Sequence, residues 1–269
     1  ISKDNVIKPE KLIFDIKNNP IGYTMKPIYN TVQLSRVVTT DYQKKNNITH
    51  DKLINIIEQI QETIHSIHND NCLIIDINDA NILIDENLKV YFIDVDSYQT
   101  ENYKATALQD YAKDFQVKNN NFTKNSDWFS FGLLSVKILL GIHPYMGRWN
   151  KFKKRDIENT LSYRSENNIS IFNNDVVYPK TVRSFSSIPK NYYQWFLNIF
   201  EKGKRILPPN KLGEFYNNSE QLVLNSQTHV LFNKKTEINK IIQNILYGFR
   251  NEIISYDNGF YFQGEYISM

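Results

Sequence analysis

Four polar residues of this chain stand at spacings that would allow chemistry on a phosphate group. They are Asp76, Asn81 five residues later, Asp94 a further thirteen residues on, and Asp127 at the head of an apolar segment. Transfer of a phosphoryl group from a nucleotide needs a carboxylate that orients or deprotonates the attacking hydroxyl, and oxygen ligands for magnesium ions on the phosphates. Asp76 has the chemistry for the first task, and Asn81 and Asp94 have it for the second.

The segments around these residues predict a small hairpin that would bring the polar groups together. Apolar runs at 82–84 and 88–93 flank a turn at 85–87, which is the pattern of two short antiparallel strands. Asp76 and Asn81 precede the first strand, and Asp94 follows the second. Because the two open ends of a hairpin lie side by side, we expect these three side chains to converge.

The rest of the chain predicts a mixture of helices and strands. Apolar residues recur at alternating steps of four and three from Leu53 to Ile67, which indicates one face of an amphipathic helix. Helices are expected over 53–67, 127–140, about 190–202 and 237–247, and strand hairpins over 11–25 and 253–262.

The composition excludes several classes of protein. The single cysteine, Cys72, rules out an internal disulfide and a Cys-rich zinc site, and it favours a reducing compartment such as the cytoplasm. With 32 Lys and Arg against 29 Asp and Glu, the chain lacks the basic excess of a nucleic-acid-binding protein. No apolar run is long enough to cross a membrane. None of the nine glycines is spaced as in a Gly-rich phosphate loop.

Taken together, the motifs resemble the protein-kinase family, and most closely a divergent bacterial branch of protein-kinase-like proteins. That branch has a hinge G-Y-x-M-P, a catalytic loop G-D-x-N-x-x-N, a metal motif D-V-D-S-F-Q and a later motif H-P-F-x-G. The chain has G-Y-T-M-K-P at 22–27, D-I-N-D-A-N at 76–81, D-V-D-S-Y-Q at 94–99, D-W-F-S-F-G at 127–132 and H-P-Y-M-G at 143–147. The resemblance covers about residues 6 to 215.

The resemblance implies an α+β, protein-kinase-like fold with a mostly helical C-terminal lobe. It also implies a truncated N-terminal lobe, of which only a hairpin and the hinge remain. The chain would then divide into an N-lobe remnant and hinge at 1–27, a kinase-like C-lobe at 28–215, and an extension with a helix and a β-hairpin at 216–269.

Roles for the polar residues follow from the same resemblance. It implies that Asp76 is the catalytic base, that Asn81 and Asp94 are magnesium ligands, and that Asp127 anchors the backbone of the catalytic loop. Asn78 stands where most kinases place a lysine that contacts the γ-phosphate. Because an amide cannot neutralise charge, slower transfer is expected.

The hinge residues would lie beside the adenine of ATP. By the resemblance these cofactor-binding residues are Tyr23, Thr24, Met25 and Pro27. ATP and magnesium are therefore the implied cofactors. The implied partners are a protein substrate or a regulatory protein, together with an upstream N-lobe, and include neither nucleic acid nor a membrane.

The chain also departs from the family in ways that leave two functions open. It contains no Gly-rich loop and no phosphate-pairing lysine before the hinge, and Ile75 replaces the arginine that usually precedes the catalytic aspartate. One reading is a Ser/Thr phosphotransferase that works with an upstream lobe. The alternative is a pseudokinase that acts as a binding scaffold. Transfer to a small molecule is a third and weaker reading.

Two further expectations concern residues outside the site. No A-P-E occurs between Asp94 and Asp127, so a standard platform for peptide substrates is not expected. The glutamate of that motif is the usual partner of the arginine at position 205, so Arg205 is expected to pair elsewhere. His65 and His68 lie three residues apart on the predicted helix, where a surface or interface role is expected.

Overall fold

The computed structural model describes residues 1–105, 113–117 and 119–210, and four strands nearer the C-terminus. The chain divides into two compact units, Ile1–Gly213 and Glu214–Met269. Among the described residues, no helix is both long and apolar enough to cross a membrane.

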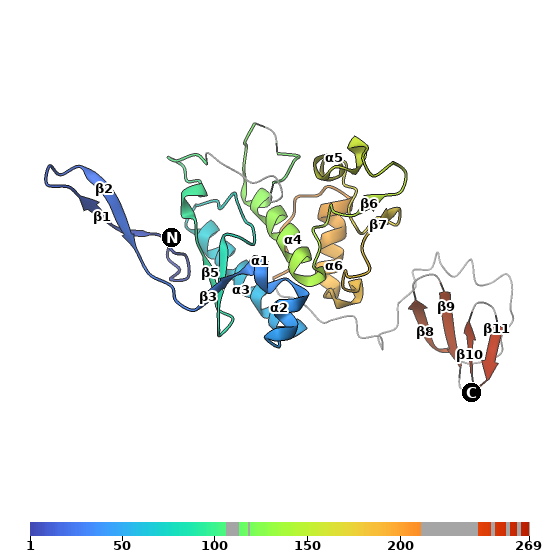
Figure 1. The fold of residues 1–269 in the computed structure, drawn as a ribbon. Coiled ribbons are helices and arrows are strands. Elements are labelled where there is room, and N and C mark those ends of the chain that lie inside the picture. Colours follow the sequence, from blue (N-terminus) through green and yellow to red (C-terminus); the bar gives the residue numbers. More distant parts are fainter. Residues whose placement is uncertain are drawn as a thin grey trace. The chain divides into compact units, whose positions relative to one another are not determined.

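The first unit begins with the predicted hairpin. Strand β1 (Pro9–Phe14) pairs antiparallel with β2 (Pro20–Met25). The Asp15 carboxylate accepts hydrogen bonds from the N–H groups of Lys17 and Asn19, both at 2.8 Å, and so closes the turn. Nearly all side chains of the two strands are exposed. Figure 1 shows the hairpin extending away from the rest of the unit.

A second sheet carries the hairpin that the sequence predicts around the polar residues. Its order is β3 (Thr31–Gln33), β4 (Ile82–Asp85) and β5 (Val90–Phe92), and both pairings are antiparallel. Short helices α1 (Leu34–Val37) and α2 (Thr40–Lys45) follow β3. The start of the chain lies along β5, since Ile7 N–H donates to the Phe92 carbonyl and Phe92 N–H to that of Asn5, each at 2.8 Å.

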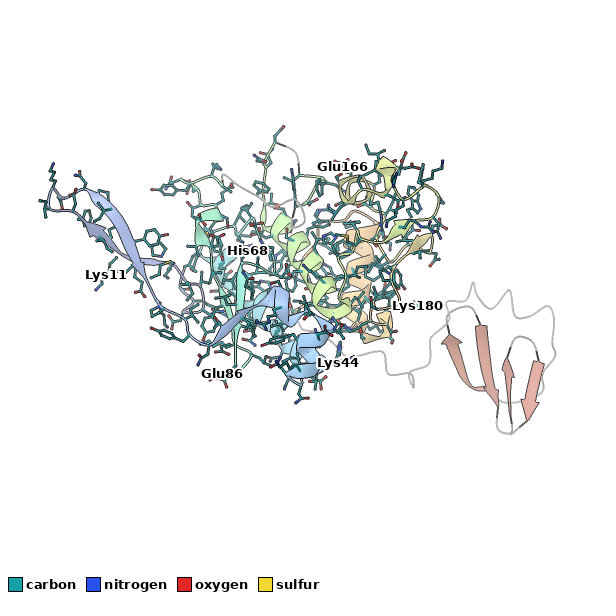
Figure 2. All side chains as sticks on the ribbon, viewed as in Figure 1. Lys11, Lys44, His68, Glu86, Glu166 and Lys180 are labelled. Carbon is teal, nitrogen blue, oxygen red and sulfur yellow. The ribbon has the colours of Figure 1, made fainter. Side chains whose placement is uncertain are left out.

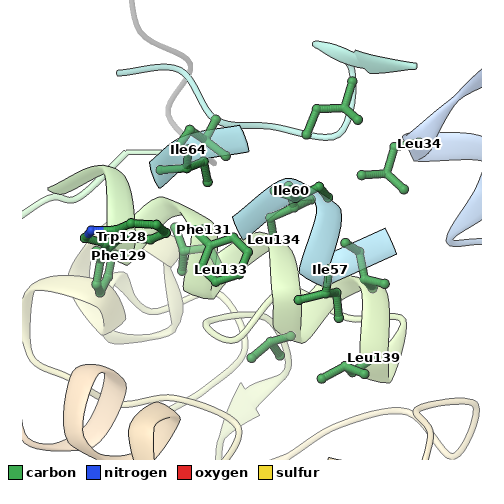
Figure 3. Close-up of a cluster of buried hydrophobic side chains, with 14 of the residues drawn as sticks. Leu34, Ile57, Ile60, Ile64, Trp128, Phe129, Phe131, Leu133, Leu134 and Leu139 are labelled. Carbon is green, nitrogen blue, oxygen red and sulfur yellow. The ribbon is translucent and has the colours of Figure 1, made fainter. Parts of the chain in front are cut away.

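Two long helices form the core of this unit. Helix α3 (His50–Asn69) buries the predicted apolar stripe, and α4 (Lys124–Leu140) is buried on nearly all sides. Figure 3 shows Ile57, Ile60 and Ile64 of α3 close to the apolar side chains of α4. A capping box at Thr123 begins α4, and Gly141, with a left-handed φ of 78°, ends it as expected.

The remaining elements of the unit cover the other side of α4. The predicted helix near 190–202 is present as α6 followed by one turn of π-helix, η5. Gly132 of α4 allows this segment to approach closely, because a Cβ atom there would lie 2.5 Å from Ile199 Cδ1. These elements are β6 (Arg148–Trp149), η3 (Ile157–Asn159), α5 (Leu161–Glu166), β7 (Val176–Val177), η4 (Phe185–Ser187), α6 (Lys190–Phe196) and η5 (Leu197–Glu201). The short helix η1 (Val95–Ser97) instead lies beside the loop that precedes β4, where Ser97 Oγ donates to the Ile74 carbonyl.

The second unit contains an antiparallel sheet in the order β11-β10-β9-β8. The predicted hairpin at 253–262 is confirmed, because Tyr256 pairs with Gly259 and Ile253 with Phe262. The strands are β8 (Ile242–Gly248), β9 (Asn251–Tyr256), β10 (Gly259–Phe262) and β11 (Glu265–Ser268).

The helix predicted over 237–247 is wrong from residue 242 onward, where strand β8 stands; residues 237–241 lie outside the described residues. The spacing of its apolar residues fits a helix face, but a short apolar run rich in isoleucine fits a strand equally well. Pairing decides between the two: β8 lies antiparallel to β9, with Ile245 opposite Ile254.

Candidate active site

The loop between α3 and β4 brings together the first predicted pair of polar residues. The Asp76 side chain is 6% exposed. The Nδ2 group of Asn81 donates one hydrogen bond to Asp76 Oδ2 at 3.1 Å and another to the Asp76 carbonyl at 3.2 Å. The amide nitrogen of Asn81 therefore fixes the orientation of the Asp76 carboxylate. The amide oxygen, Oδ1, is the atom of Asn81 that can bind a metal ion.

Asn78 shapes this loop from within. Its side-chain oxygen accepts hydrogen bonds from the N–H groups of Ala80 at 2.8 Å and Asn81 at 3.1 Å, while its Nδ2 donates to the Asp76 carbonyl at 3.2 Å. These bonds turn the chain so that Asn81 faces back toward Asp76. The contact of Asn78 with a phosphate stays a prediction.

Asp127 anchors the loop from the start of α4, as the sequence predicts. Its Oδ2 accepts the N–H of Ile74 and its Oδ1 accepts that of Ile75, both at 2.9 Å. Ile75 has a φ of 68°, and a β-branched residue in the left-handed region costs on the order of 1–3 kcal/mol. The two hydrogen bonds hold the backbone in that conformation.

His68 completes the anchor, and its expected surface role is wrong. Figure 2 labels His68 in the interior of the first unit, and the side chain is buried. Its Nε2 lies 2.8 Å from Asp127 Oδ2. His68 lies on α3 against the first turn of α4. There the rings of His68 and Trp128 pack edge to face, with 5.2 Å between their centres. The spacing between His65 and His68 in the sequence could not predict this contact, because Asp127 is 59 residues from His68.

The third predicted residue, Asp94, stands at the end of β5, in the left-handed conformation, just before η1. Its segment is tied to the catalytic loop: Ile93 N–H donates to the Asn81 carbonyl at 3.0 Å, and Leu73 and Gln99 exchange two backbone hydrogen bonds at 2.8 Å. These bonds bring Asp94 to the side of the loop where Asp76 and Asn81 lie.

Negative charge is concentrated at this point. Hydrogen bonding with Asp96, partial burial, and repulsion by Asp96 and Asp76 raise the pKa of Asp94 to about 6. A cation would relieve that repulsion. No group of three His, Cys, Asp or Glu side chains that could hold a metal occurs among the described residues. Magnesium held by one carboxylate, one amide oxygen, water and phosphate oxygens needs no such group, so Asp94 and Asn81 fit this ion.

The predicted hinge residues lie on β2 and just after it. Tyr23, Thr24, Met25 and Pro27 are all exposed. Their contact with an adenine ring stays a prediction.

Arg205 has a partner that the sequence analysis missed. Its Nε and Nη2 donate to the two carboxylate oxygens of Asp114 at 2.6 and 2.7 Å, and its guanidinium group lies 4.0 Å from the centre of the Phe129 ring. Asp114 lies between Asp94 and Asp127, in the segment where the resemblance places the acidic partner of this arginine. An acidic residue in that segment was the available signal, although the sequence around it is A-K-D rather than A-P-E.

We expect Asp114→Ala to lower the free energy of unfolding by about 3 kcal/mol, because it leaves the largely buried charge of Arg205 without its carboxylate partner. Urea denaturation would measure the loss. A matched control is Asp175→Ala, which removes the exposed ion pair with Lys151 at 2.9 Å and is expected to cost less than about 1 kcal/mol. Equal losses in the two variants would contradict this role of Asp114.

A comparison with family models now decides the class of protein. Residues 16–248 match the protein kinase domain. The chain belongs to the protein kinase domain family. The mixed helices and strands of the structure are consistent with the α+β kinase fold.

Known relatives of this kinase domain are distant. A "Serine/threonine-protein kinase 1" of Heliothis zea nuclear polyhedrosis virus is 22% identical over 136 residues, which cover 46% of this chain and 51% of the relative. A probable serine/threonine-protein kinase of Dictyostelium discoideum is 25% identical over 192 residues, or 61% of this chain and 39% of the relative.

A "G-type lectin S-receptor-like serine/threonine-protein kinase" of Arabidopsis thaliana is 29% identical over 112 residues, which cover 38% of this chain and 14% of that protein. The chain thus spans about half or less of the length of these three relatives. The bacterial branch indicated by the D-V-D-S-Y-Q motif stays a prediction.

Proposed function

We propose that this kinase domain transfers the γ-phosphoryl group of Mg-ATP to serine or threonine hydroxyls of a protein substrate. The observation that carries the proposal is the convergence of Asp76, Asn81 and Asp94 at one end of the β4–β5 hairpin, with Asn81 bonded to the Asp76 carboxylate at 3.1 Å. The three relatives are all named as serine/threonine-protein kinases, which supports the choice of acceptor.

In this proposal each polar residue has a separate task. Asp76 orients the acceptor hydroxyl and takes its proton as the oxygen attacks. Asn81 holds Asp76 in place through Nδ2 and, with Asp94, holds magnesium through oxygen atoms. When bound, Mg-ATP would supply the γ-phosphoryl group, and ADP would be the leaving group. Because Asn78 carries no positive charge, this chain provides less electrostatic stabilisation of the transferred group than a lysine would.

The proposal includes an upstream N-terminal lobe that completes the nucleotide site. Exposed apolar side chains line the β1–β2 hairpin, among them Leu12 at 61%, Ile21 at 65% and Met25 at 48% exposure. A further layer of strands would cover them. The same lobe would bring adenine to Tyr23, Thr24, Met25 and Pro27. The single Cys72, which is buried and unpaired, supports a cytoplasmic location.

Calorimetry tests this division of the site. We expect the 269-residue chain alone to bind Mg-ATP weakly, with a dissociation constant of about 1 mM or more, and the protein that also carries its upstream segment to bind at least about tenfold more tightly. The reason is that the short chain contains neither a Gly-rich loop to cover the phosphates nor a lysine to pair with them. Tight binding by the short chain alone would contradict the need for an upstream lobe.

A scaffold or pseudokinase function is the second candidate. It is favoured by the absence of a Gly-rich loop from the sequence and by the use of Asn78 inside the loop. Its partner would be a regulatory protein rather than a substrate. Incorporation of labelled phosphate into a protein by the version with its upstream segment would decide for the enzyme, and nucleotide binding without any transfer would decide for the scaffold.

A further inference from the structure

A large groove opens beside the catalytic loop and is separate from the predicted nucleotide contacts. Its volume is about 1180 Å³. Its walls come from the catalytic loop, the start of α1, the end of α4 and the chain that follows, and strand β7 with the residues after it. This volume exceeds that of an ordinary small-molecule pocket, which reaches about 1,000 Å³.

The groove reaches the reaction centre through two residues of the catalytic loop. Asp79 and Ala80 line it, and Ala80 is followed directly by Asn81, which holds the Asp76 carboxylate. A chain lying in the groove would therefore contact the catalytic loop at the residue that precedes Asn81. The groove is placed to hold the residues that flank the acceptor.

The charge of the groove is positive. Its acidic residue, Asp79, is buried and already paired with Lys137, whose Nζ lies 2.7 Å from Asp79 Oδ2. Two more cations, Arg148 and Lys154, line the groove and are exposed. The ion pairs found among the described residues include neither of them. The groove thus presents cationic groups that are available to an acidic ligand.

The position of Arg148 is set by a tight turn. Gly147 has a φ of 101°, and a Cβ atom there would lie 2.8 Å from the Val177 carbonyl. Only glycine therefore allows β6 and β7 to approach so closely. The Arg148 Nη2 group also donates to Asn150 Oδ1 at 2.9 Å. Both contacts hold the guanidinium group at the rim.

Apolar side chains share the rim with these cations. Met146 and Val177 are 50% and 48% exposed although both line the groove. Tyr178 and Pro179 continue the apolar surface. Exposed apolar side chains beside cations suit a polypeptide with both acidic and apolar residues better than a purely ionic ligand.

We propose that this groove binds an acidic segment of the protein substrate, with Arg148 and Lys154 contacting its carboxylates. The inference rests on the proposed kinase function and adds the substrate class to it. Charge complementarity selects the acidic segment, and the contiguity of Ala80 with Asn81 places the acceptor residue at Asp76.

Peptide binding by the whole chain, in the absence of nucleotide, tests the proposal. The probes are a fluorescein-labelled peptide with a central serine flanked by glutamate and leucine, and the same peptide with lysine in place of glutamate. Fluorescence anisotropy at about 0.15 M salt, where the Debye length is about 8 Å, should show at least about tenfold tighter binding of the acidic peptide. The double variant Arg148→Glu with Lys154→Glu should lose that preference.

Matched controls separate the groove from net charge. The double variant Lys44→Glu with Lys45→Glu makes the same change in charge at exposed positions of α2 outside the groove (Figure 2 labels Lys44) and should leave the preference intact. Failure of both peptides to bind, or an unchanged preference in the double variant, would overturn the proposal. Equal binding of an oligonucleotide of the same net charge would overturn it too. Because no nucleotide is present, failure of phosphoryl transfer would affect only the proposed function.

Discussion

Asp76→Asn should reduce phosphoryl transfer by about 10²–10⁴-fold and leave the binding of Mg-ATP within about twofold of the wild type. The substitution keeps the shape of the side chain and removes the group that accepts the proton. Asn81 would still lie beside it. Radiolabelled transfer to a serine peptide and calorimetry, both on the protein with its upstream segment, give the two quantities separately.

Asp94→Ala, in contrast, should weaken the binding of nucleotide as well as transfer. It removes a metal ligand, so magnesium-dependent binding of nucleotide is expected to fall by at least about a hundredfold, and transfer would be lost with it. Asp41→Asn provides a control, because Asp41 is an exposed carboxylate on α2 and both activities should be retained. Equal loss of binding in the Asp76 and Asp94 variants would contradict the separate roles.

Asp127→Ala should also have a large effect, and this one concerns stability. It removes the acceptor of two backbone N–H groups and of the buried His68 ring. Buried donors left without a partner, together with a strained Ile75, should lower the free energy of unfolding by about 3–5 kcal/mol. A shift of the urea midpoint with an unchanged m-value would measure it.

The matched control for this loss is Asp156→Ala. Asp156 Oδ2 accepts the N–H of Lys153 at 2.8 Å in a surface turn, so water can replace it. The expected cost is about 1 kcal/mol. Asp127→Asn should lie between the two, since an amide keeps one acceptor oxygen. A cost for Asp127→Ala as small as that for Asp156→Ala would show that the carboxylate does not hold the catalytic loop.

Much of the secondary structure could be predicted because it follows from local patterns. The apolar stripe of α3, the uniformly apolar α4 with Gly141 after it, and the β4–β5 hairpin each carry their own periodicity and end signals. Strand β8 could not be predicted in this way, because the spacing of its apolar residues suits both a helix and a strand. Its pairing with β9 decides between the two.

For the candidate site, the identity and order of the polar residues could be predicted without a structure. Asp76, Asn81, Asp94 and Asp127 follow one another in the family's frame, and the hairpin between Asn81 and Asp94 predicts that the first three converge. The order of the motifs predicts this arrangement because the strands and their connections are short, and short connections allow few ways of placing neighbouring elements.

Only the tertiary structure decided which groups pair across long separations. The pairing of His68 with Asp127 spans 59 residues and that of Arg205 with Asp114 spans 91. The cationic groove likewise gathers residues from the catalytic loop, α4 and the chain beyond it. No local pattern encodes such contacts, because they form when helices and loops pack, and packing selects partners by shape and burial rather than by distance along the chain.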